Sequence, residues 1–180
     1  MVPSSHRHWI AVASAEHVAN GVALGIMQVC HGKGGPLRRI RPGDRIIYYS
    51  PTGTFRGADR LQHFTALGIV RSGEPYQVRM SEDFHLYRRD VDYLPARPAS
   101  ILPLLAQLEF AHGNWGWKLR LGLIEITPED SARIAEAMNV ALPDPAKEPA
   151  DGDIRSSARL PPRLPARLPD VPRRSGRRRA

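Results

Sequence analysis

The chain has 180 residues, of which 42% are hydrophobic and 7% aromatic, values typical of a globular protein rather than a disordered or fibrous one. No stretch approaches the roughly 18 apolar residues of a membrane span, and the first residues lack the apolar core of a signal peptide. The single cysteine, Cys30, excludes an internal disulfide and fits a reducing compartment. We therefore expect a cytoplasmic protein that does not contact a membrane.

Charge and composition divide the chain after residue 142. Residues 1–142 contain 16 Lys and Arg against 13 Asp and Glu, a net charge of +3, whereas residues 143–180 contain 10 against 5, a net charge of +5. The second part repeats Arg-Leu-Pro three times, and proline at this density prevents helix formation. We expect a folded domain at 6–142 and a disordered, Arg/Pro-rich basic tail at 143–180. Such a tail is attracted to polyanions such as nucleic acid, or is an extension without a partner.

The first half of the domain alternates short apolar runs with turn signals. Residues 8–13 form an apolar run typical of a buried strand, and Ser14 is placed to cap a weak helix over 15–27. Pro36 suits the first turn of a short helix. Further strands are predicted at 45–50 and at 62–70, the latter with Gly68 marking a bulge or a close approach.

The second half continues the same pattern. Apolar residues at helical spacing predict a helix over 101–110, and Thr127-Pro128-Glu129-Asp130 is a strong helix start, with threonine as the cap. The remaining strands are predicted at 76–80, 86–93 and 118–126. Roughly six strands without regular strand–helix alternation indicate an α+β domain around a mostly antiparallel, curved sheet or open barrel.

A basic, glycine-rich segment lies at residues 29–39. Three glycines surround Lys33 just before the predicted helix start, so backbone N–H groups there can meet an anion while the lysine supplies charge. The spacing is not that of a Walker loop, and a turn that needs glycine only for its backbone angles is the alternative. Cys30 and His31 are adjacent, which places them poorly for proton transfer, so we do not expect a catalytic cysteine.

Five aromatic residues lie on or beside predicted strands. Tyr48 and Tyr49 are adjacent, so one ring is expected to face inward and the other outward, while Trp115 and Trp117 share a face if their segment is extended. An aromatic exposed near glycine and arginine is suited to stacking on a base. The alternative, that these rings and Trp9 are all packed in the core, stays open.

Evidence for catalysis or metal binding is weak. Seven histidines are present, but none forms a metal-like pair with a second cysteine or an acidic cluster, so we expect no metal and no cofactor. The polar groups that an enzyme could use are His31, Asp44, Asp90 and Asp92, and they do not form a nucleophile–base–orienter set. We therefore do not expect an enzyme.

Several motifs together resemble one known family. They are WIAVAS (9–14), HGKGGPLRR (31–39), PGD (42–44), YYSP (48–51) and NWG (114–116), in the family's order across residues 8–138. The chain resembles the EVE domain family, whose bacterial members form the UPF0310 group within the PUA-like superfamily that includes YTH domains. The resemblance implies a PUA-like mixed or antiparallel pseudobarrel flanked by short helices. It also implies nucleic-acid binding, since YTH domains hold N6-methyladenosine in an aromatic cage and some EVE-type domains are implicated in reading modified cytosine in DNA.

The sequence thus favours a non-catalytic module that binds RNA or DNA and recognises a modified nucleobase in an aromatic-lined pocket. The alternatives are an enzyme acting on nucleotides or RNA, and a protein-interaction module that uses the Arg-Leu-Pro tail as a polyproline ligand. The nucleic-acid backbone is expected to contact Lys33, Arg38 and Arg39. The ligand-binding residues expected are Trp9, Ser14, His31, Lys33, Gly34, Tyr49, Ser50, Asn114, Trp115 and Trp117.

Overall fold

The structure is a computed structural model that describes residues 6–29, 33–79 and 85–142. Its strands are β1 (His8–Val12), β2 (Ile26–Met27), β3 (Arg45–Ser50), β4 (His63–Val70), β5 (Tyr76–Arg79), β6 (His85–Tyr93), β7 (Ala99–Ser100) and β8 (Leu123–Ile126). Its α-helices are α1 (Ala15–Leu24), α2 (Gly34–Arg38), α3 (Trp115–Leu119) and α4 (Pro128–Ala137). Two 3₁₀ turns are η2 (Leu102–Leu104) and η3 (Glu109–Ala111).

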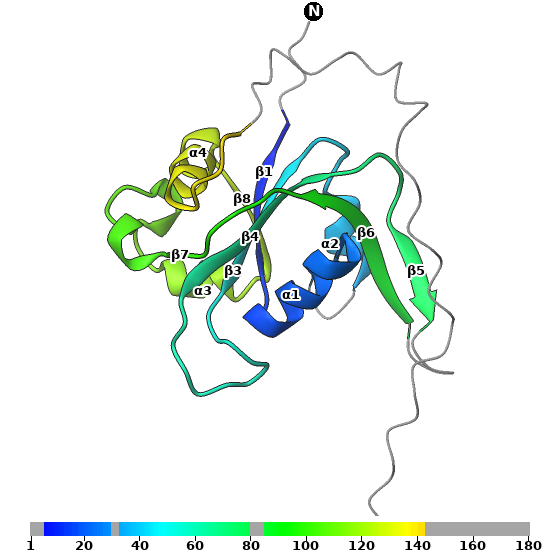
Figure 1. The fold of residues 1–180 in the computed structure, drawn as a ribbon, viewed down its shortest axis with the longest axis horizontal. Coiled ribbons are helices and arrows are strands. Elements are labelled where there is room, and N and C mark those ends of the chain that lie inside the picture. The colour runs from blue at the N-terminus through cyan, green and yellow to red at the C-terminus, as the bar shows by residue number, and fades with distance from the viewer. Residues whose placement is uncertain (1–5, 30–32, 80–84, 143–180) are drawn as a thin grey trace, which may run out of the picture. The chain divides into compact units, whose positions relative to one another are not determined.

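The strands form one mixed, open sheet in the described part of the chain. The hydrogen-bonded order is β2-β6-β4-β3-β1-β8, with β5 added to β6 and β7 added to β4 (Figure 1). Among these pairings only β1 with β3 is parallel, and the others are antiparallel. The predicted α+β class with a mostly antiparallel sheet is confirmed, and the sheet does not close into a barrel.

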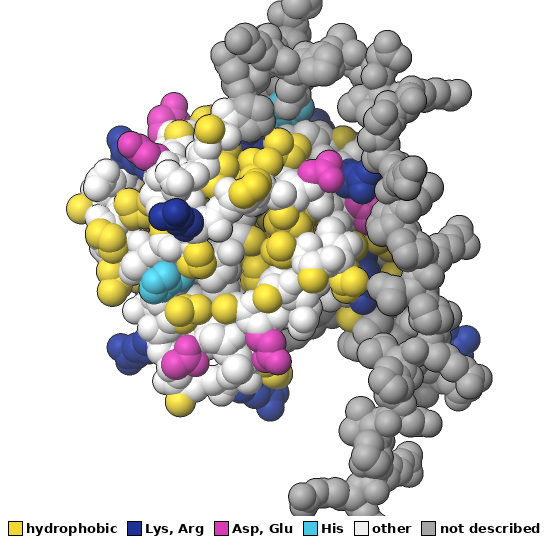
Figure 2. Space-filling view, in the orientation of Figure 1, with side chains coloured by type: hydrophobic (Ala, Val, Ile, Leu, Met, Phe, Trp, Pro, Cys, Tyr) yellow, Lys and Arg dark blue, Asp and Glu magenta, His cyan; other side chains and the backbone are white. Residues whose placement is uncertain are grey.

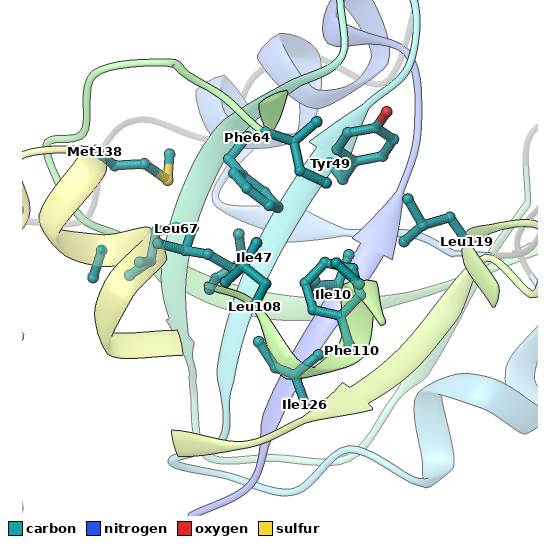
Figure 3. Close-up of a cluster of buried hydrophobic side chains, with 14 of the residues drawn as sticks. Ile10, Ile47, Tyr49, Phe64, Leu67, Leu108, Phe110, Leu119, Ile126 and Met138 are labelled. Atoms are coloured by element: carbon teal, nitrogen blue, oxygen red, sulfur yellow. The ribbon is translucent and has the colours of Figure 1, made fainter. Parts of the chain in front are cut away.

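Hydrophobic side chains cover both faces of the central strands. The cluster on the α4 side is drawn in Figure 3, where side chains from β1, β3 and β4 meet those from the segment around η3 and from α4. The cluster on the α1 side contains Trp9 and Tyr48 together with residues of α1 and α2. Figure 2 shows that hydrophobic side chains also gather near the middle of the drawn face, while most charged side chains lie at its margin.

Burial of both faces corrects the expectation for the tyrosine pair. Tyr48 and Tyr49 point to opposite faces of β3, as alternation requires. Tyr48 joins the α1-side cluster and Tyr49 the α4-side cluster, and both are buried. The prediction of one outward-facing ring assumed a solvated face that this sheet does not have at β3.

The prediction of a helix over residues 101–110 is wrong. The segment forms η2 and η3 instead, because its amide groups find an acceptor outside the segment. Asp130 Oδ1 accepts from the Glu109 N–H at 2.8 Å, and Asp130 Oδ2 accepts from the Phe110 N–H at 3.0 Å. In a continuous helix those two N–H groups would bond to carbonyls four residues earlier. A tertiary hydrogen bond to a buried carboxylate has overridden the apolar periodicity.

The strand predicted over 118–126 is only half correct. Residues 115–119 form α3, because the Asn114 side chain caps a helical turn by accepting from the Trp117 N–H at 3.3 Å. Gly122, at φ 77°, then turns the chain into β8. Trp115 and Trp117 therefore do not share a face: Trp115 packs against the α4-side cluster, whereas Trp117 is 58% exposed.

Two other local predictions are confirmed. Thr127 Oγ1 accepts from the Asp130 N–H at 3.2 Å and caps α4, with Pro128 in its first turn. Gly68 marks a close approach, since a Cβ there would lie 2.5 Å from Val91 Cγ1. The irregular register between β3 and β4 lies elsewhere, between Tyr48 and Tyr49.

Two histidines are expected to make the fold sensitive to acid. Burial, followed by the neighbouring Arg45 guanidinium, lowers the pKa of His8 below its ordinary value of 6.5, and burial followed by Arg88 lowers the pKa of His17. A lowered folded-state pKa means that the unfolded chain takes up protons first as pH falls. Stability should therefore be constant above pH 6.5 and decline below it.

Urea unfolding between pH 5 and 8 measures this decline. His8→Gln should make the slope below pH 6.5 shallower, because it removes the more buried of the two imidazoles. If the free energy of unfolding declined below pH 6.5 as steeply in His8→Gln as in the wild type, His8 would not be a source of the acid sensitivity.

Candidate functional site

A pocket of about 750 Å³ opens between α1, α2, the end of α3 and the segment that follows β2. Its walls are largely apolar, which is typical of small-molecule sites, with a few polar groups among them. Three polar or titratable side chains on these walls are Ser14, His17 and Gln28. The described lining residues are Val12, Ala13, Ser14, His17, Gln28, Val29, Lys33, Pro36, Phe55, Leu86, Leu119, Arg120, Leu121 and Gly122.

Ser14 lies at the junction of β1 and α1. It occupies the N-cap position, yet its side chain makes no capping hydrogen bond. The first N–H groups of α1 are satisfied instead by the loop after β3, with Ala15 N–H donating to Thr52 O at 3.0 Å and Glu16 N–H to Gly53 O at 2.9 Å. The hydroxyl that normally caps a helix is therefore left at the pocket wall.

Gln28 is fixed in place through its backbone. The Tyr48 hydroxyl donates to the Gln28 carbonyl at 2.9 Å and accepts from the Gln28 N–H at 3.3 Å. Burial raises the pKa of Tyr48, so this hydroxyl stays protonated and remains a donor. Tyr93 holds the preceding strand in the same way, donating to Ile26 O at 3.0 Å.

The side chain of Gln28 is the unusual feature of the pocket. Its amide nitrogen Nε2 is buried and has no hydrogen-bond partner in the part of the chain that the structure describes. A buried donor without an acceptor costs about 1–3 kcal/mol, so such groups are rare in folded proteins. An acceptor on a bound ligand would remove that cost.

The charged side chains that line the pocket in the described residues are all cationic. Lys33 and Arg120 line it, and no carboxylate does so among the described residues. Because its pKa is lowered, His17 is neutral at pH 7 and offers one donor and one acceptor. The pocket therefore combines neutral hydrogen-bonding groups, of which His17 lies at the exposed edge, with cations.

Trp9 does not lie in this pocket. It is fully buried in the α1-side cluster, and its Nε1–H donates to Asp44 Oδ2 at 2.9 Å. The Arg7 and Arg39 guanidinium carbons lie 4.7 and 5.0 Å from the centre of its ring. Trp9 is therefore a core residue whose ring and N–H group both have partners within the protein.

Tyr49, Ser50 and Trp115 form a second group near the end of β3. The Tyr49 ring meets the Trp115 ring edge-on at a centroid distance of 6.4 Å. Ser50 Oγ and Thr65 Oγ1 share a hydrogen bond of 2.7 Å. Trp9 and Tyr49 belong to clusters on opposite faces of the sheet, so the structure does not bring these two rings together in one cage.

The predicted basic segment is only partly at the pocket. Lys33 lines it, Gly34 is buried behind it, and the Arg38 guanidinium lies 5.4 Å from the centre of the Tyr87 ring. His31 and Cys30 lie outside the described residues. Of the ten predicted ligand-binding residues, those that line the pocket are Ser14 and Lys33.

Gly34 packs directly on an aromatic ring. A Cβ at this position would lie 3.0 Å from the Cγ and Cδ2 atoms of Tyr87, whereas a Cβ at Gly35 would meet nothing within 4 Å. We expect Gly34→Ala to lower the free energy of unfolding by about 1 kcal/mol through overpacking. Gly35→Ala is the matched control and should be neutral or slightly stabilising in urea unfolding. Equal stabilities of the two variants would contradict the packing described here.

The carboxylates considered for catalysis have other partners and do not line the pocket. Asp44 is buried against Trp9, Asp90 Oδ1 accepts from the Tyr76 hydroxyl at 2.8 Å, and Asp92 lies 3.5 Å from Arg71 Nε. Within residues 6–29, 33–79 and 85–142 no group of three or more His, Cys, Asp or Glu is placed to hold a metal ion. None of the described helices combines the length and the hydrophobicity needed to cross a membrane.

Twelve of the fourteen lining residues were not predicted, and those among them with polar, charged or aromatic side chains are His17, Gln28, Phe55 and Arg120. Gln28 is a lone polar residue between Met27 and Val29, and Phe55 is a lone aromatic in a polar, glycine-rich loop. Each residue differs in polarity from its neighbours in the sequence, and such a difference could have indicated a binding residue. His17 lies on the exposed side of a helix and gives no comparable signal.

The open mixed sheet with short helices is the architecture that the sequence motifs predict. Residues 7–137 match the family described as the EVE domain, and the chain belongs to this family. The UPF0310 protein msl3206 of Mesorhizobium japonicum is 55% identical over 135 residues, which cover 73% of this chain and 91% of that protein.

Two solved structures align with this chain at low sequence identity, and the first of them has the same fold. A hypothetical protein from Leishmania major aligns with a TM-score of 0.54 and 11% identity over 77% of this chain and 98% of that one. The YTH domain of the Zygosaccharomyces rouxii MRB1 protein, in complex with N6-methyladenosine RNA, aligns with a TM-score of 0.49 and 15% identity over 76% of this chain and 88% of that one.

Proposed function

We propose that this protein is a non-catalytic reader of a modified nucleobase in RNA or DNA, and that the base occupies the pocket between α1, α2 and the end of α3. The observation that carries the proposal is the buried, unpartnered Nε2 of Gln28 on the wall of an apolar pocket. A base presents ring nitrogens and carbonyl oxygens that accept such a donor. Membership in the EVE domain family supports nucleic-acid binding as the setting.

The pocket walls suit a base better than a charged metabolite. Apolar side chains such as Val29 and Leu119 cover most of the surface, and a methyl group on a base gains hydrophobic free energy against such a wall. Ser14 and neutral His17 supply further hydrogen bonds to the base edge. The cations Lys33 and Arg120 are suited to the phosphates on either side of the base.

Binding to matched oligonucleotides tests the proposal. Single-stranded DNA and RNA pentanucleotides with a central N6-methyladenine or 5-methylcytosine are compared with their unmodified counterparts by fluorescence anisotropy at fixed salt. We expect one modified oligonucleotide to bind about fourfold more tightly than its unmodified counterpart, because a methyl group buried against the apolar wall contributes about 0.8 kcal/mol. Equal affinities for every modified and unmodified pair would contradict the proposal.

A further inference from the structure

The loop between β3 and β4, residues 51–62, presents an exposed aromatic ring at the rim of the pocket. Phe55 keeps 67% of its surface exposed, and it lines the pocket. Exposing a phenylalanine forfeits the free energy that burial would contribute. The ring is also the most exposed of the large hydrophobic side chains in the described residues. Its position points to a contact with the part of a ligand that lies outside the pocket.

Hydrogen bonds hold this loop in one conformation. The N–H of Gly57 donates to the Thr54 carbonyl at 3.0 Å, and the N–H of Gly53 donates to Asp59 Oδ2 at 2.7 Å. A Cβ at Gly57 would lie 2.5 Å from Asp59 Oδ1 and 3.2 Å from the Thr54 carbonyl oxygen, so the turn is tightly packed there. The exposure of Phe55 therefore follows from an ordered loop.

The loop is also attached to the pocket wall. The carbonyls of Thr52 and Gly53 accept the first two N–H groups of α1, those of Ala15 and Glu16. Ser14, which lines the pocket, immediately precedes these residues. Phe55 is thus held at a fixed distance from the pocket interior, which is the geometry needed to contact a neighbouring group of the same ligand.

One cation lies over the Phe55 ring. Arg56 has a left-handed backbone at φ 57°, and its guanidinium carbon lies 5.2 Å from the centre of the Phe55 ring. Despite this contact, Phe55 remains 67% exposed and so accessible to a stacking partner. Arg120 and exposed Leu121 line the pocket as well. An exposed apolar ring with a cation over it, at a pocket that Arg120 also lines, matches a base attached to phosphates.

We propose that Phe55 stacks on the base next to the one held in the pocket, so that the site contacts two successive nucleotides of a single strand. The inference rests on the proposed function, since it takes the pocket to be occupied by a base. It adds a second contact surface, composed of Phe55 and Arg56, and a single-stranded nucleic acid as the partner of that surface.

Phe55→Ala, compared with Leu24→Ala, tests this contact. Leu24 is a matched control because it is an apolar residue of similar exposure, 59% against 67%, at the end of α1, and it does not line the pocket. Affinities are measured for the modified pentanucleotides, for the same pentanucleotides with abasic residues beside the central base, and for the free nucleosides.

Loss of a base–aromatic stack should weaken pentanucleotide binding at least about fivefold. We expect this loss from Phe55→Ala and from the abasic flanks in the wild type, with no further loss when the two are combined. Nucleoside affinity and the Leu24→Ala variant should be unchanged. Unchanged pentanucleotide affinity in Phe55→Ala, or losses that multiply when combined, would overturn the inference.

The two proposals fail in different ways. If modified and unmodified oligonucleotides bind equally, the proposed function fails, and the combined Phe55→Ala and abasic measurement still decides whether Phe55 stacks on a base. If no oligonucleotide binds, both proposals are overturned.

Discussion

Asp44→Ala is expected to lower the free energy of unfolding by about 3 kcal/mol or more. The Asp44 carboxylate is 2% exposed and accepts three hydrogen bonds, from the Arg7 N–H at 3.0 Å, from Trp9 Nε1–H at 2.9 Å and from the Arg41 N–H at 2.9 Å. Hydrogen bonds to a charged group contribute about 1.5–3 kcal/mol each, and removing the acceptor leaves buried donors unpaired.

Tryptophan fluorescence during urea unfolding measures this loss. Asp92→Ala is the control, because its ion pair with Arg71 has side chains that are 70% and 56% exposed. Exposed pairs of this kind contribute about 0–1 kcal/mol. A loss in Asp44→Ala no larger than that in Asp92→Ala would show that the carboxylate does not hold β1, the turn before β3 and Trp9 together.

Gln28→Met is expected to weaken binding of the preferred modified oligonucleotide by about 10- to 100-fold. The substitution keeps the length of the side chain and removes the amide donor, so the acceptor on the bound base is left unpaired at a cost of about 1–3 kcal/mol. The backbone hydrogen bonds from Gln28 to Tyr48 do not involve the side chain and are retained.

The same substitution should not reduce stability. In the free protein Gln28 Nε2 is buried without a partner among the described residues, so replacing it by a thioether removes an unsatisfied polar group. We expect the free energy of unfolding to be equal to or higher than that of the wild type. Gln77→Met, at an exposed position of β5, is the control and should leave binding unchanged. Weaker folding with unchanged binding in Gln28→Met would contradict a role in ligand recognition.

The strands were predictable because their physical cause is local. The runs at 45–50 and 62–70 carry apolar residues bounded by turn residues, and they became β3 and β4. The cap at Thr127 is likewise determined by four consecutive residues, 127–130. The failures at 101–110 and 118–126 have a different cause. Asp130 and Asn114 supply hydrogen-bond acceptors to these segments, and only the folded chain shows which amides they reach.

The pocket was predictable only in part, because most of its residues come together only in the folded chain. Ser14 and Lys33 follow from a cap position and a glycine-rich turn, and both line the pocket. The aromatic cage could not be predicted, because the surroundings of Trp9 and Tyr49 depend on which faces of the sheet are covered. The unpaired amide of Gln28 could not be predicted either. Whether a glutamine lacks a partner depends on atoms from several distant segments.

Titration of ¹⁵N-labelled protein with N6-methyladenosine, 5-methylcytidine and their unmodified counterparts tests base recognition in the pocket most directly. The side-chain NH₂ group of Gln28 gives its own pair of NMR signals. We predict that one modified nucleoside shifts this pair, together with the backbone signal of Val29, at concentrations where its unmodified counterpart leaves them in place. Signals of Gln28 that stay fixed with every nucleoside, while those around Trp115 move, would place the ligand elsewhere and contradict the account.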